Sequence, residues 1–302
     1  MNDTLRDAVR RYTETYADPA GVARAPIRGL SLIRATRPSG IDYAISRPVA
    51  CLVLQGVKRV SMGAQNFTFS AGDSLLITSD VPTVSQVTQA SATEPYLSLI
   101  FDLDLATIAE LAIEMKLAPT PHDAPIANEP SDEEVADAAL RLMRLIERPA
   151  ALPVLQTQAL REMHYWLLVG KHGPVIRQLG WPESHAQRIS RAVAMLRADF
   201  ARPLPMERLA DAAGMSLSSF YKRFRLATSL SPLQFQKQLR LIEARRLMIS
   251  EAMSASSAAF AVGYESVQQF TREYRRMFGL PPAQDVDATR GADEHATSVL
   301  TS

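Results

Sequence analysis

The 302-residue sequence contains one cysteine, five histidines and no long apolar run. The single thiol of Cys51 can form neither an intrachain disulfide nor a cysteine-based metal site, so packed cores must supply the stability. No stretch approaches 18 consecutive apolar residues, and the charged start MNDTLRDAVRRYTETY has no apolar segment of the signal-peptide kind. These absences predict a cytoplasmic protein with no membrane span. The 47% hydrophobic and 22% charged residues are typical of a folded protein with room for two domains.

The sequence also lacks the usual patterns of enzymes. It has no Gly-rich phosphate loop, no G-x-S-x-G turn and no convincing Ser-His-Asp arrangement. A metal site in a β-barrel needs three or four converging His and carboxylate ligands, but residues 1–163 contain only His122. Three later histidines, His164, His172 and His185, have no ligand spacing and are interpreted as surface or packing residues. We therefore predict a protein that is not an enzyme, with no metal and no cofactor.

Charge is distributed unevenly along the chain. The formal net charge is +1, but residues 1–184 carry −4, residues 185–285 carry +7 and residues 286–302 carry −2. A basic block of this kind is the electrostatic footprint of a nucleic-acid-binding domain attached to a different kind of domain.

The first half of the chain reads as β-structure followed by helices. From about residue 27 to 102, short strands alternate with turn residues, which predicts an antiparallel sandwich or small barrel. The period then becomes helical at 103–115, 131–147 and 154–169, with a Pro-rich loop before the second of these helices. The apolar stripes of the last two helices can close the barrel or form a dimer interface, and we favour the dimer interface. The segment KHGPVIRQLGWPES, with two Gly and two Pro, predicts the domain boundary.

The second half is helical and repeats itself. Aligning Gly214 with Gly263 superposes LADAAGMSLSSFYKRF on AAFAVGYESVQQFTREY, apart from one extra residue after Gly263. Each copy has a small-residue helix, a Gly turn, a Ser and two aromatics four residues apart, which is the pattern of a helix-turn-helix unit. The residues expected to bury the face between the helices are Ala213, Phe220 and Phe224 in the first copy and Val262, Phe270 and Tyr274 in the second.

The opposite face of each second helix is polar and basic. Arg and Lys can bond guanine, Gln can bond adenine, and Ser or Thr can reach a base or a phosphate, so these faces are expected to read the major groove. The residues predicted to read bases are Ser218, Ser219, Tyr221, Lys222, Gln268, Gln269, Thr271 and Arg272. The residues predicted to contact phosphates are Arg223, Arg225, Lys237 and Arg275.

A long helix is predicted between the two copies. Ser231 followed by Pro232 is a helix start, with a capping side chain and the favoured first-turn proline. About 18 residues at 1.5 Å each span roughly 27 Å. Two reading helices tied to this rod could enter successive major grooves, which lie about 34 Å apart.

These strings resemble a known family. About residues 188–283 are similar to the DNA-binding domain of AraC-type transcriptional regulators. The similarity is carried by GMSLSSFYKRFRLATSLSPLQFQKQLRLIEARRLMIS, followed by AFAVGYESVQQFTREYRRMFGLPP. The chain departs from that pattern at Leu230, where a Gly-Met pair is more usual, and at 254–258, where an Ile or Val often packs. Residues 25–170 resemble the N-terminal sensor region of the same family, a cupin-like barrel followed by helices used for dimerisation.

The resemblance implies an α+β two-domain protein. We expect an N-terminal arm at 1–24, and a cupin-like antiparallel β-barrel with a helical connector for effector binding and dimerisation at 25–170. These are followed by a linker at 171–186. After the linker we expect an all-α DNA-binding domain with tandem helix-turn-helix motifs at 187–284 and a flexible tail at 285–302. The expected effector pocket includes Tyr43, Cys51, Gln55 and Phe69. A lowered thiol pKa next to Lys58 or Arg59 would make Cys51 reactive, whereas the simpler interpretation is a small buried apolar side chain.

The function implied is a sequence-specific transcription regulator, effector-responsive and an activator. Its partners would be double-stranded DNA, RNA polymerase, an unidentified small-molecule effector and a second copy in a homodimer, with no membrane. One alternative is a regulator whose barrel docks a protein partner. The other is a cupin-type metalloenzyme fused to a DNA-binding domain.

Overall fold

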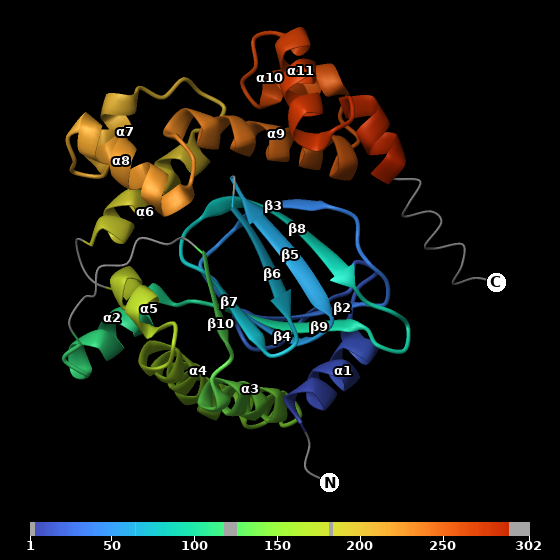
Figure 1. The fold of residues 1–302 in the computed structure, drawn as a ribbon, viewed down its shortest axis with the longest axis vertical. Coiled ribbons are helices and arrows are strands. Elements are labelled where there is room, and N and C mark those ends of the chain that lie inside the picture. The colour runs from blue at the N-terminus through green and yellow to red at the C-terminus, as the bar shows by residue number, and fades with distance from the viewer. Residues whose placement is uncertain (1–3, 64, 118–125, 181–183, 290–302) are drawn as a thin grey trace.

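The computed structural model describes residues 4–63, 65–117, 126–180 and 184–289. A β-rich unit with helices packed on it lies below an all-helical unit, and the chain passes between them once (Figure 1). The expected α+β two-domain architecture, a β-barrel with a helical connector followed by tandem helix-turn-helix motifs, is confirmed.

Two antiparallel sheets form the barrel. The larger sheet contains, in spatial order, β1 (Val22–Arg24), β2 (Leu30–Ala35), β9 (Tyr96–Asp102), β4 (Val49–Gln55), β7 (Asp73–Ile77) and β10 (Ile126–Pro130). The smaller sheet contains β3 (Asp42–Ser46), β8 (Val81–Gln89), β5 (Val57–Met62) and β6 (Gln65–Ser70). Strand β10 falls in the segment expected to be a Pro-rich loop, and it pairs with β7 through its backbone. His122 lies outside the described residues.

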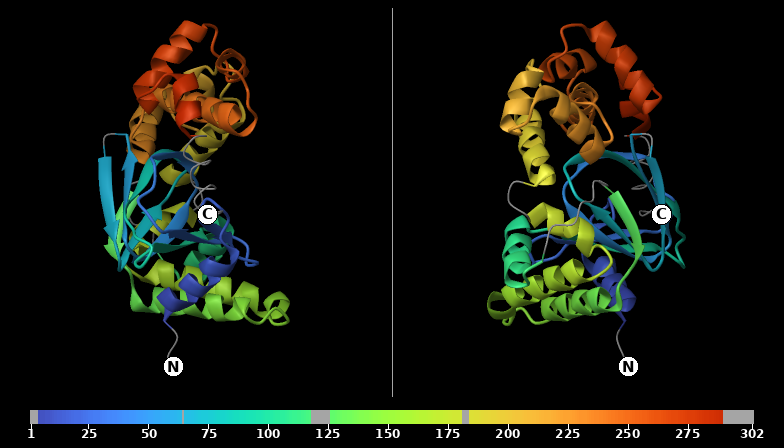
Figure 2. Two further views of the ribbon diagram at one scale, coloured as in Figure 1. Left: turned by 90° about the vertical axis from the view of Figure 1, so that its right-hand side faces the viewer. Right: turned by 60° about the vertical axis from the view of Figure 1, so that its left-hand side comes forward.

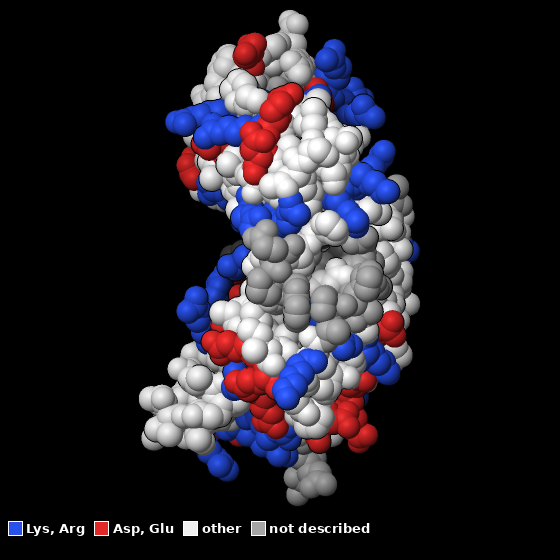
Figure 3. Space-filling model, turned by 90° about the vertical axis from the view of Figure 1, so that its left-hand side faces the viewer, with Lys and Arg blue, Asp and Glu red and all other residues white. Residues whose placement is uncertain are grey.

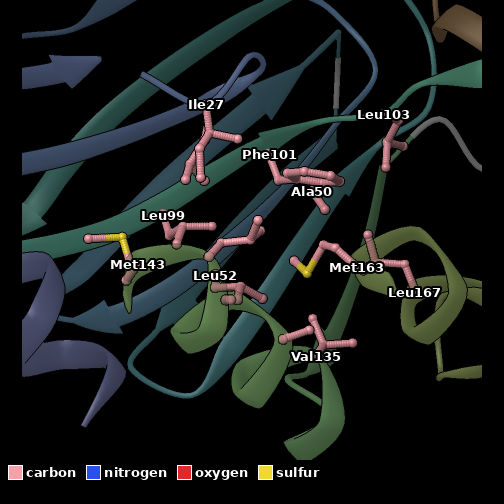
Figure 4. Packing of buried hydrophobic residues seen from close by; sticks show 14 of the residues in the cluster. Ile27, Ala50, Leu52, Leu99, Phe101, Leu103, Val135, Met143, Met163 and Leu167 are labelled. Atoms are coloured by element: carbon pink, nitrogen blue, oxygen red, sulfur yellow. The ribbon is translucent and has the colours of Figure 1, made fainter. Parts of the chain in front are cut away.

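The larger sheet is buried on both faces. Because successive side chains of a strand point to opposite faces, Cys51 and Val53 of β4 point into the barrel, where their apolar cluster continues into the first helix-turn-helix motif. Leu52 points the other way and joins Leu99 and Phe101 against the helices (Figure 4). Two helices cover that outer face, α3 (Glu133–Ile146) and α4 (Leu152–Val169). The helical connector is thus part of the fold of the barrel unit.

The expected N-terminal arm is a structured part of this unit. Helix α1 (Leu5–Tyr16) buries Leu5, Ala8 and Val9 in the same apolar cluster as the outer face of the sheet, and β1 pairs with β2. The apolar residues of α1 recur at helical spacing, so docking this helix removes one coherent stripe from water.

The expected linker at 171–186 also contains regular structure. Helix α5 (Gly173–Gly180) packs against α2 (Leu105–Glu114), and a Cβ at Gly180 would lie 2.7 Å from the backbone nitrogen of Ala109. Glycine is the residue that allows this close approach. The two glycines that suggested a break in the sequence therefore belong to a packed helix.

A buried histidine holds the start of α2. The backbone N–H of Asp104, the N-cap of α2, donates to His164 Nε2 at 2.9 Å, and His164 Nδ1 donates to the carbonyl of Leu160 at 2.7 Å. The ring is 2% exposed and meets Phe101 edge-on at 4.9 Å. Burial lowers the pKa of His164 below its ordinary value, although the Leu160 bond and the charge of Asp104 oppose that shift. The neutral ring satisfies one donor and one acceptor, so protonation would break the Asp104 bond.

This pKa shift predicts a loss of stability in mild acid. Since the folded pKa lies below the ordinary value of 6.5, the contribution of His164 is fully present above pH 6.5 and is lost as the pH falls toward the folded pKa. Each histidine of this kind can contribute a slope of up to about 1.4 kcal/mol per pH unit. Urea unfolding should be measured between about pH 5 and pH 8. The free energy of unfolding should fall less steeply with decreasing pH for His164→Gln than for the unaltered chain. Equal slopes would contradict this role of His164.

The helical unit contains the two predicted helix-turn-helix motifs. Helix α6 (His185–Ala198) precedes the first motif, which consists of α7 (Met206–Ala212) and α8 (Leu217–Thr228). The second consists of α10 (Ala255–Ala261) and α11 (Val267–Phe278). Between them, α9 (Pro232–Ser250) begins with the predicted cap, a reciprocal pair of bonds between Ser231 and Gln234. The two motifs lie at opposite ends of α9, which crosses the end of the barrel (Figures 1 and 2).

The prediction of a flexible tail is wrong for residues 285–289. Residues 282–289 are helical, and Asp285 and Val286, taken as whole residues, are each 8% exposed. The small and polar composition suggested fraying, but Val286 joins the apolar cluster of the second motif and Asp285 forms charged hydrogen bonds there. Residues 290–302 of that expected tail lie outside the described residues.

Candidate DNA-reading surface

The second helix of each motif is held by aromatic side chains from its own sequence. Phe220 and Phe224 of α8 and Phe270 and Tyr274 of α11 are fully buried, as the repeat predicts. The two rings of each helix lie 5.4 Å apart, and Ala213 or Val262 packs behind them without exposure. Ser216 and Ser266 cap the starts of α8 and α11. The aromatic face is therefore committed to the core and the other face is left for a partner.

The opposite faces carry the residues predicted to read DNA. Most of these side chains are exposed, namely Ser218, Tyr221, Lys222, Arg225, Gln268, Gln269, Arg272 and Arg275. Four are partly buried, namely Ser219, Arg223, Thr271 and Lys237. On the face shown in Figure 3, several basic side chains lie on the upper, helical end together with a few acidic ones, and both kinds are mixed on the lower end. An exposed polar and basic face on each of two matched helices has the chemistry that major-groove recognition requires.

Glu273 of α11 gathers polar groups that the sequence analysis did not connect. Its carboxylate accepts from Lys237 Nζ at 2.9 Å, Gln269 Nε2 at 3.2 Å and the hydroxyl of Tyr264 at 2.9 Å. Burial alone would raise the pKa of Glu273, but the bonds from Lys237, Gln269 and Tyr264 outweigh burial and lower it. In this structure Lys237, expected at a phosphate, instead ties the connecting helix α9 to α11.

An arginine from the preceding helix holds each Gly turn. Arg188 Nε of α6 donates to the carbonyl of Ala213 at 2.7 Å, next to Gly214. Arg240 Nη1 of α9 donates to the carbonyl of Gly263 at 2.9 Å. A cation at these carbonyls satisfies acceptors at the end of a short helix. The sequence analysis missed both arginines, because their partners are more than 20 residues away along the chain.

The family comparisons agree with this geometry. A model of the AraC-type transcriptional regulator N-terminus matches residues 26–175, and a helix-turn-helix domain model matches residues 209–287. The chain belongs to the AraC-type transcriptional regulators. The resemblance noted in the sequence is therefore confirmed in both halves.

Curated AraC-type relatives match parts of the chain. The transcriptional activator RhaS of Escherichia fergusonii is 28% identical over 154 residues, which is 51% of this chain and 55% of RhaS. The regulator GbdR of Pseudomonas aeruginosa is 30% identical over 112 residues, 37% of this chain and 30% of GbdR. The chain therefore spans about half the length, or less, of these curated relatives.

Solved structures of ToxT from Vibrio cholerae share the fold. An apo form of ToxT from Vibrio cholerae aligns with a TM-score of 0.55 at 9% identity, covering 87% of this chain and 98% of ToxT. ToxT was also solved bound to (E)-4-(8-methylnaphthalen-1-yl)but-3-enoic acid, with a TM-score of 0.55 and 9% identity, covering 84% of this chain and 98% of ToxT. At this identity the likeness describes the fold of the two domains.

The four residues expected in an effector pocket do not come together. Cys51 and Phe69 share the apolar cluster inside the barrel. Gln55 instead accepts from Arg10 Nη2 at 3.0 Å and donates to the carbonyl of Pro95 at 2.8 Å. Tyr43 packs against the second helix-turn-helix motif, where its hydroxyl donates to the carbonyl of Met277 at 3.3 Å. Only Cys51 and Phe69 therefore remain candidates for contact with a molecule inside the barrel.

The structure does not provide the lowered thiol pKa that the hypothesis of a reactive Cys51 requires. Burial raises the pKa of the Cys51 thiol, and the nearby charge of Lys58 and the hydroxyls of Ser98 and Tyr96 offset only part of that shift. The side chain is 5% exposed. A protonated and shielded thiol is a poor nucleophile, so the structure favours the buried apolar interpretation.

The described ranges contain neither a cluster of metal ligands nor a membrane-spanning helix. Within residues 4–63, 65–117, 126–180 and 184–289, no three or more His, Cys, Asp or Glu side chains are grouped to hold a metal ion. No helix in the described part of the chain is both long and apolar enough to span a bilayer. His164 and His172 are both buried packing residues, and His185 is exposed at the start of α6.

Proposed function

We propose that the chain is a sequence-specific, double-stranded DNA-binding transcription regulator that acts in the cytoplasm. The carrying observation is the pair of matched helices, α8 and α11, each with an exposed polar and basic face and each at one end of α9. The 19 residues of α9 extend about 28 Å, comparable with the roughly 34 Å between successive major grooves. One chain could thus read two neighbouring sites on one side of a duplex.

The residues that we assign to base reading are the eight predicted from the sequence. Arg223, Arg225 and Arg275 are assigned to phosphates. Lys237 is assigned to phosphates as well, with the condition that it must leave Glu273 to reach them. Lys222 and Arg272 are the long cationic side chains among the base readers, so they should provide the largest single contribution to sequence preference.

Alanine at Lys222 or Arg272 should relax the base preference at one site. If these side chains contact guanine edges, each substitution should cost about 1–3 kcal/mol on the preferred sequence and little on other sequences. The measurement is selection of bound duplexes from a random pool, followed by gel shift at defined salt. Arg144→Ala, at an exposed position of α3 in the barrel unit, is the matched control and should change nothing. A uniform loss on all sequences would instead assign these residues to phosphates.

We further propose that the regulator responds to a small molecule held by the barrel and activates transcription through RNA polymerase. The family membership and the ligand-bound structure of ToxT, which shares the fold, support this proposal. An effector can shift the equilibrium between arrangements of the two motifs only if it binds them with different affinity. Thermal shift against metabolite mixtures tests the proposal, since a ligand at 100 times its Kd stabilises by about 2.7 kcal/mol.

A homodimer is proposed through helix α4. The apolar stripe of α3 is used by the barrel core, whereas α4 leaves Val154, Leu155, Tyr165 and Val169 between 37% and 68% exposed. Exposed apolar side chains gathered at the two ends of one helix favour a protein contact. Sedimentation of the full chain and of Tyr165→Glu tests the proposal, and a dimer that survives the substitution would place the interface elsewhere.

A further inference from the structure

Arg245 of α9 lies where the barrel, the connecting helix and the second motif meet. Its Nε donates to Asp285 Oδ2 at 2.7 Å and its Nη2 to Asp285 Oδ1 at 3.4 Å, a two-point ion pair. The side chains of Arg245 and Asp285 are 19% and 12% exposed. Arg245 Nη2 also donates to the hydroxyl of Thr289 at 3.1 Å. Such a shielded pair fixes the relative orientation of the two side chains, because two N–H groups of the planar guanidinium point at the two carboxylate oxygens.

Asp285 also contacts α11, the second helix of the second motif. The hydroxyl of Tyr274, fully buried in α11, donates to Asp285 Oδ2 at 2.7 Å. Burial and the bond to Asp285 raise the pKa of Tyr274, so this hydroxyl remains a donor. One carboxylate therefore joins α9 to α11.

Tyr43 of the barrel covers the other side of Arg245. Tyr43 belongs to β3, the edge strand of the smaller sheet. The centre of its ring lies 5.8 Å from Arg245 Cζ and 4.6 Å from the ring of Phe278, which it meets edge-on. The Tyr43 hydroxyl donates to the carbonyl of Met277 in α11. The guanidinium is thus paired with Asp285 and lies over two rings, that of Tyr43 from the barrel and that of Phe278 from α11, whose centre is 5.6 Å from Arg245 Cζ.

The barrel contacts the first motif in a different way. Ser79 Oγ donates to the carbonyl of Ala227 at 3.1 Å, and Asp80 pairs with Arg197 of α6. Ser229 Oγ donates to Gln65 Oε1 at 3.3 Å. These bonds end at α6 and at the last turn of α8. Buried apolar residues of the barrel and of the first motif also belong to one cluster. The three polar contacts named here contain no link equivalent to that from Tyr43 through Arg245 and Asp285 to Tyr274.

We propose that Tyr43, Arg245 and Asp285 are positioning residues that couple the barrel to the second reading helix. Tyr43 shields and orients the guanidinium, Arg245 orients Asp285, and Asp285 holds α11 through Tyr274. A movement of β3 away from α9 admits water to the guanidinium and weakens this chain of contacts, so α11 loses its fixed position while α8 keeps its own. The coupling refines the proposed DNA-binding function. Its expected effect on DNA binding rests on that proposed function.

Hydrogen exchange of the full chain tests the coupling without DNA. Tyr43→Ala should speed amide exchange at 267–289 about fivefold, with no change at 217–228, because it removes a shielded cation–π contact. Tyr43→Phe keeps the ring on Arg245 and Phe278 but loses the hydroxyl bond to the Met277 carbonyl, so it should speed exchange at 267–289 less than Tyr43→Ala does. Asp80→Ala is the matched control on the barrel, and it should leave 267–289 unchanged.

Three exchange results would overturn the proposal. They are unchanged exchange at 267–289 in Tyr43→Ala, equal acceleration of both reading helices, or the same acceleration at 267–289 in Asp80→Ala. The first would show no coupling, and the other two would show a general loosening of the interface.

Binding to duplexes separates this proposal from the function on which it rests. On a selected duplex, Tyr43→Ala should alter affinity when the site read by α11 is intact, and should match the unaltered chain when that site is scrambled. If the unaltered chain selects no sequence at all, the proposed function fails, and the exchange result still decides the coupling. If the unaltered chain selects a sequence and Tyr43→Ala shows the same affinity ratio between the two duplexes, the coupling fails alone.

Discussion

Replacing Gly263 with alanine should destabilise the second helix-turn-helix motif by about 2–5 kcal/mol, the largest single-site effect expected in the helical unit. Gly263 has a φ of +86°, and a Cβ there would lie 1.8 Å from the carbonyl oxygen of Ala201. The left-handed backbone costs alanine about 1–2 kcal/mol. The rest is the cost of moving the backbone of Ala201, in the segment after α6, because no flexible side chain can yield.

Gly279 provides the matched control for this prediction. It follows α11 with a φ of +85°, and a Cβ there would meet nothing within 4 Å. Gly279→Ala should therefore cost only the backbone term, about 1–2 kcal/mol. Native-state hydrogen exchange of α11 measures both free energies. Equal losses in the two variants would mean that the contact between Gly263 and Ala201 contributes nothing.

Removing the guanidinium of Arg245 should cost about 3 kcal/mol, because it leaves the carboxylate of Asp285 without its ionic partner in a shielded site. Burial alone would lower the pKa of Arg245, but the bonds and charge of Asp285 raise it overall, so the pair favours the ionised arginine. Exchange of the α11 amides in Arg245→Ala measures the loss. Arg245→Lys should fall between, since a lysine keeps the charge but not the two-point geometry.

The next residue along α9 is the control for Arg245. Arg246 pairs with Glu243 and Glu251 on the exposed side of the same helix. Exposed ion pairs contribute little to stability, so Arg246→Ala should leave exchange of α11 unchanged. If Arg245→Ala and Arg246→Ala shift exchange equally, a general effect of removing a cation from α9, rather than the loss of the Asp285 pair, would explain the result.

Local patterns predicted much of the helical unit. The Gly turns, the paired aromatics and the Ser231-Pro232 start each depend on residues within about one or two helical turns, and the structure places them as predicted. The exposed reader faces follow from the same periodicity, since an aromatic face turned to the core leaves the polar face outside. The reading of DNA by those faces remains a prediction.

The errors arose where a segment's state depends on distant partners. Residues 285–289 look like a frayed end by composition, but Asp285 is held by Arg245, 40 residues earlier in the chain. Tyr43 looks like a barrel residue by its strand, yet it packs on Phe278. Gly180 looks like a break in the chain, but it allows α5 to approach α2 closely. No local pattern records such partners.

The sequence by itself determined the two-domain organisation, the duplicated motif, the capped connecting helix and the family, because each depends on periodicity or on residues near one another in the chain. Only the tertiary structure decided which polar side chains are committed to holding the motifs, as Lys237 is by Glu273 and Arg240 by the Gly263 carbonyl. It also decided that the barrel contacts both motifs and reaches α11 through Arg245. The physical reason is that burial, ion pairing and close backbone approach are properties of groups brought together by folding, and their free energies do not exist in the separate segments.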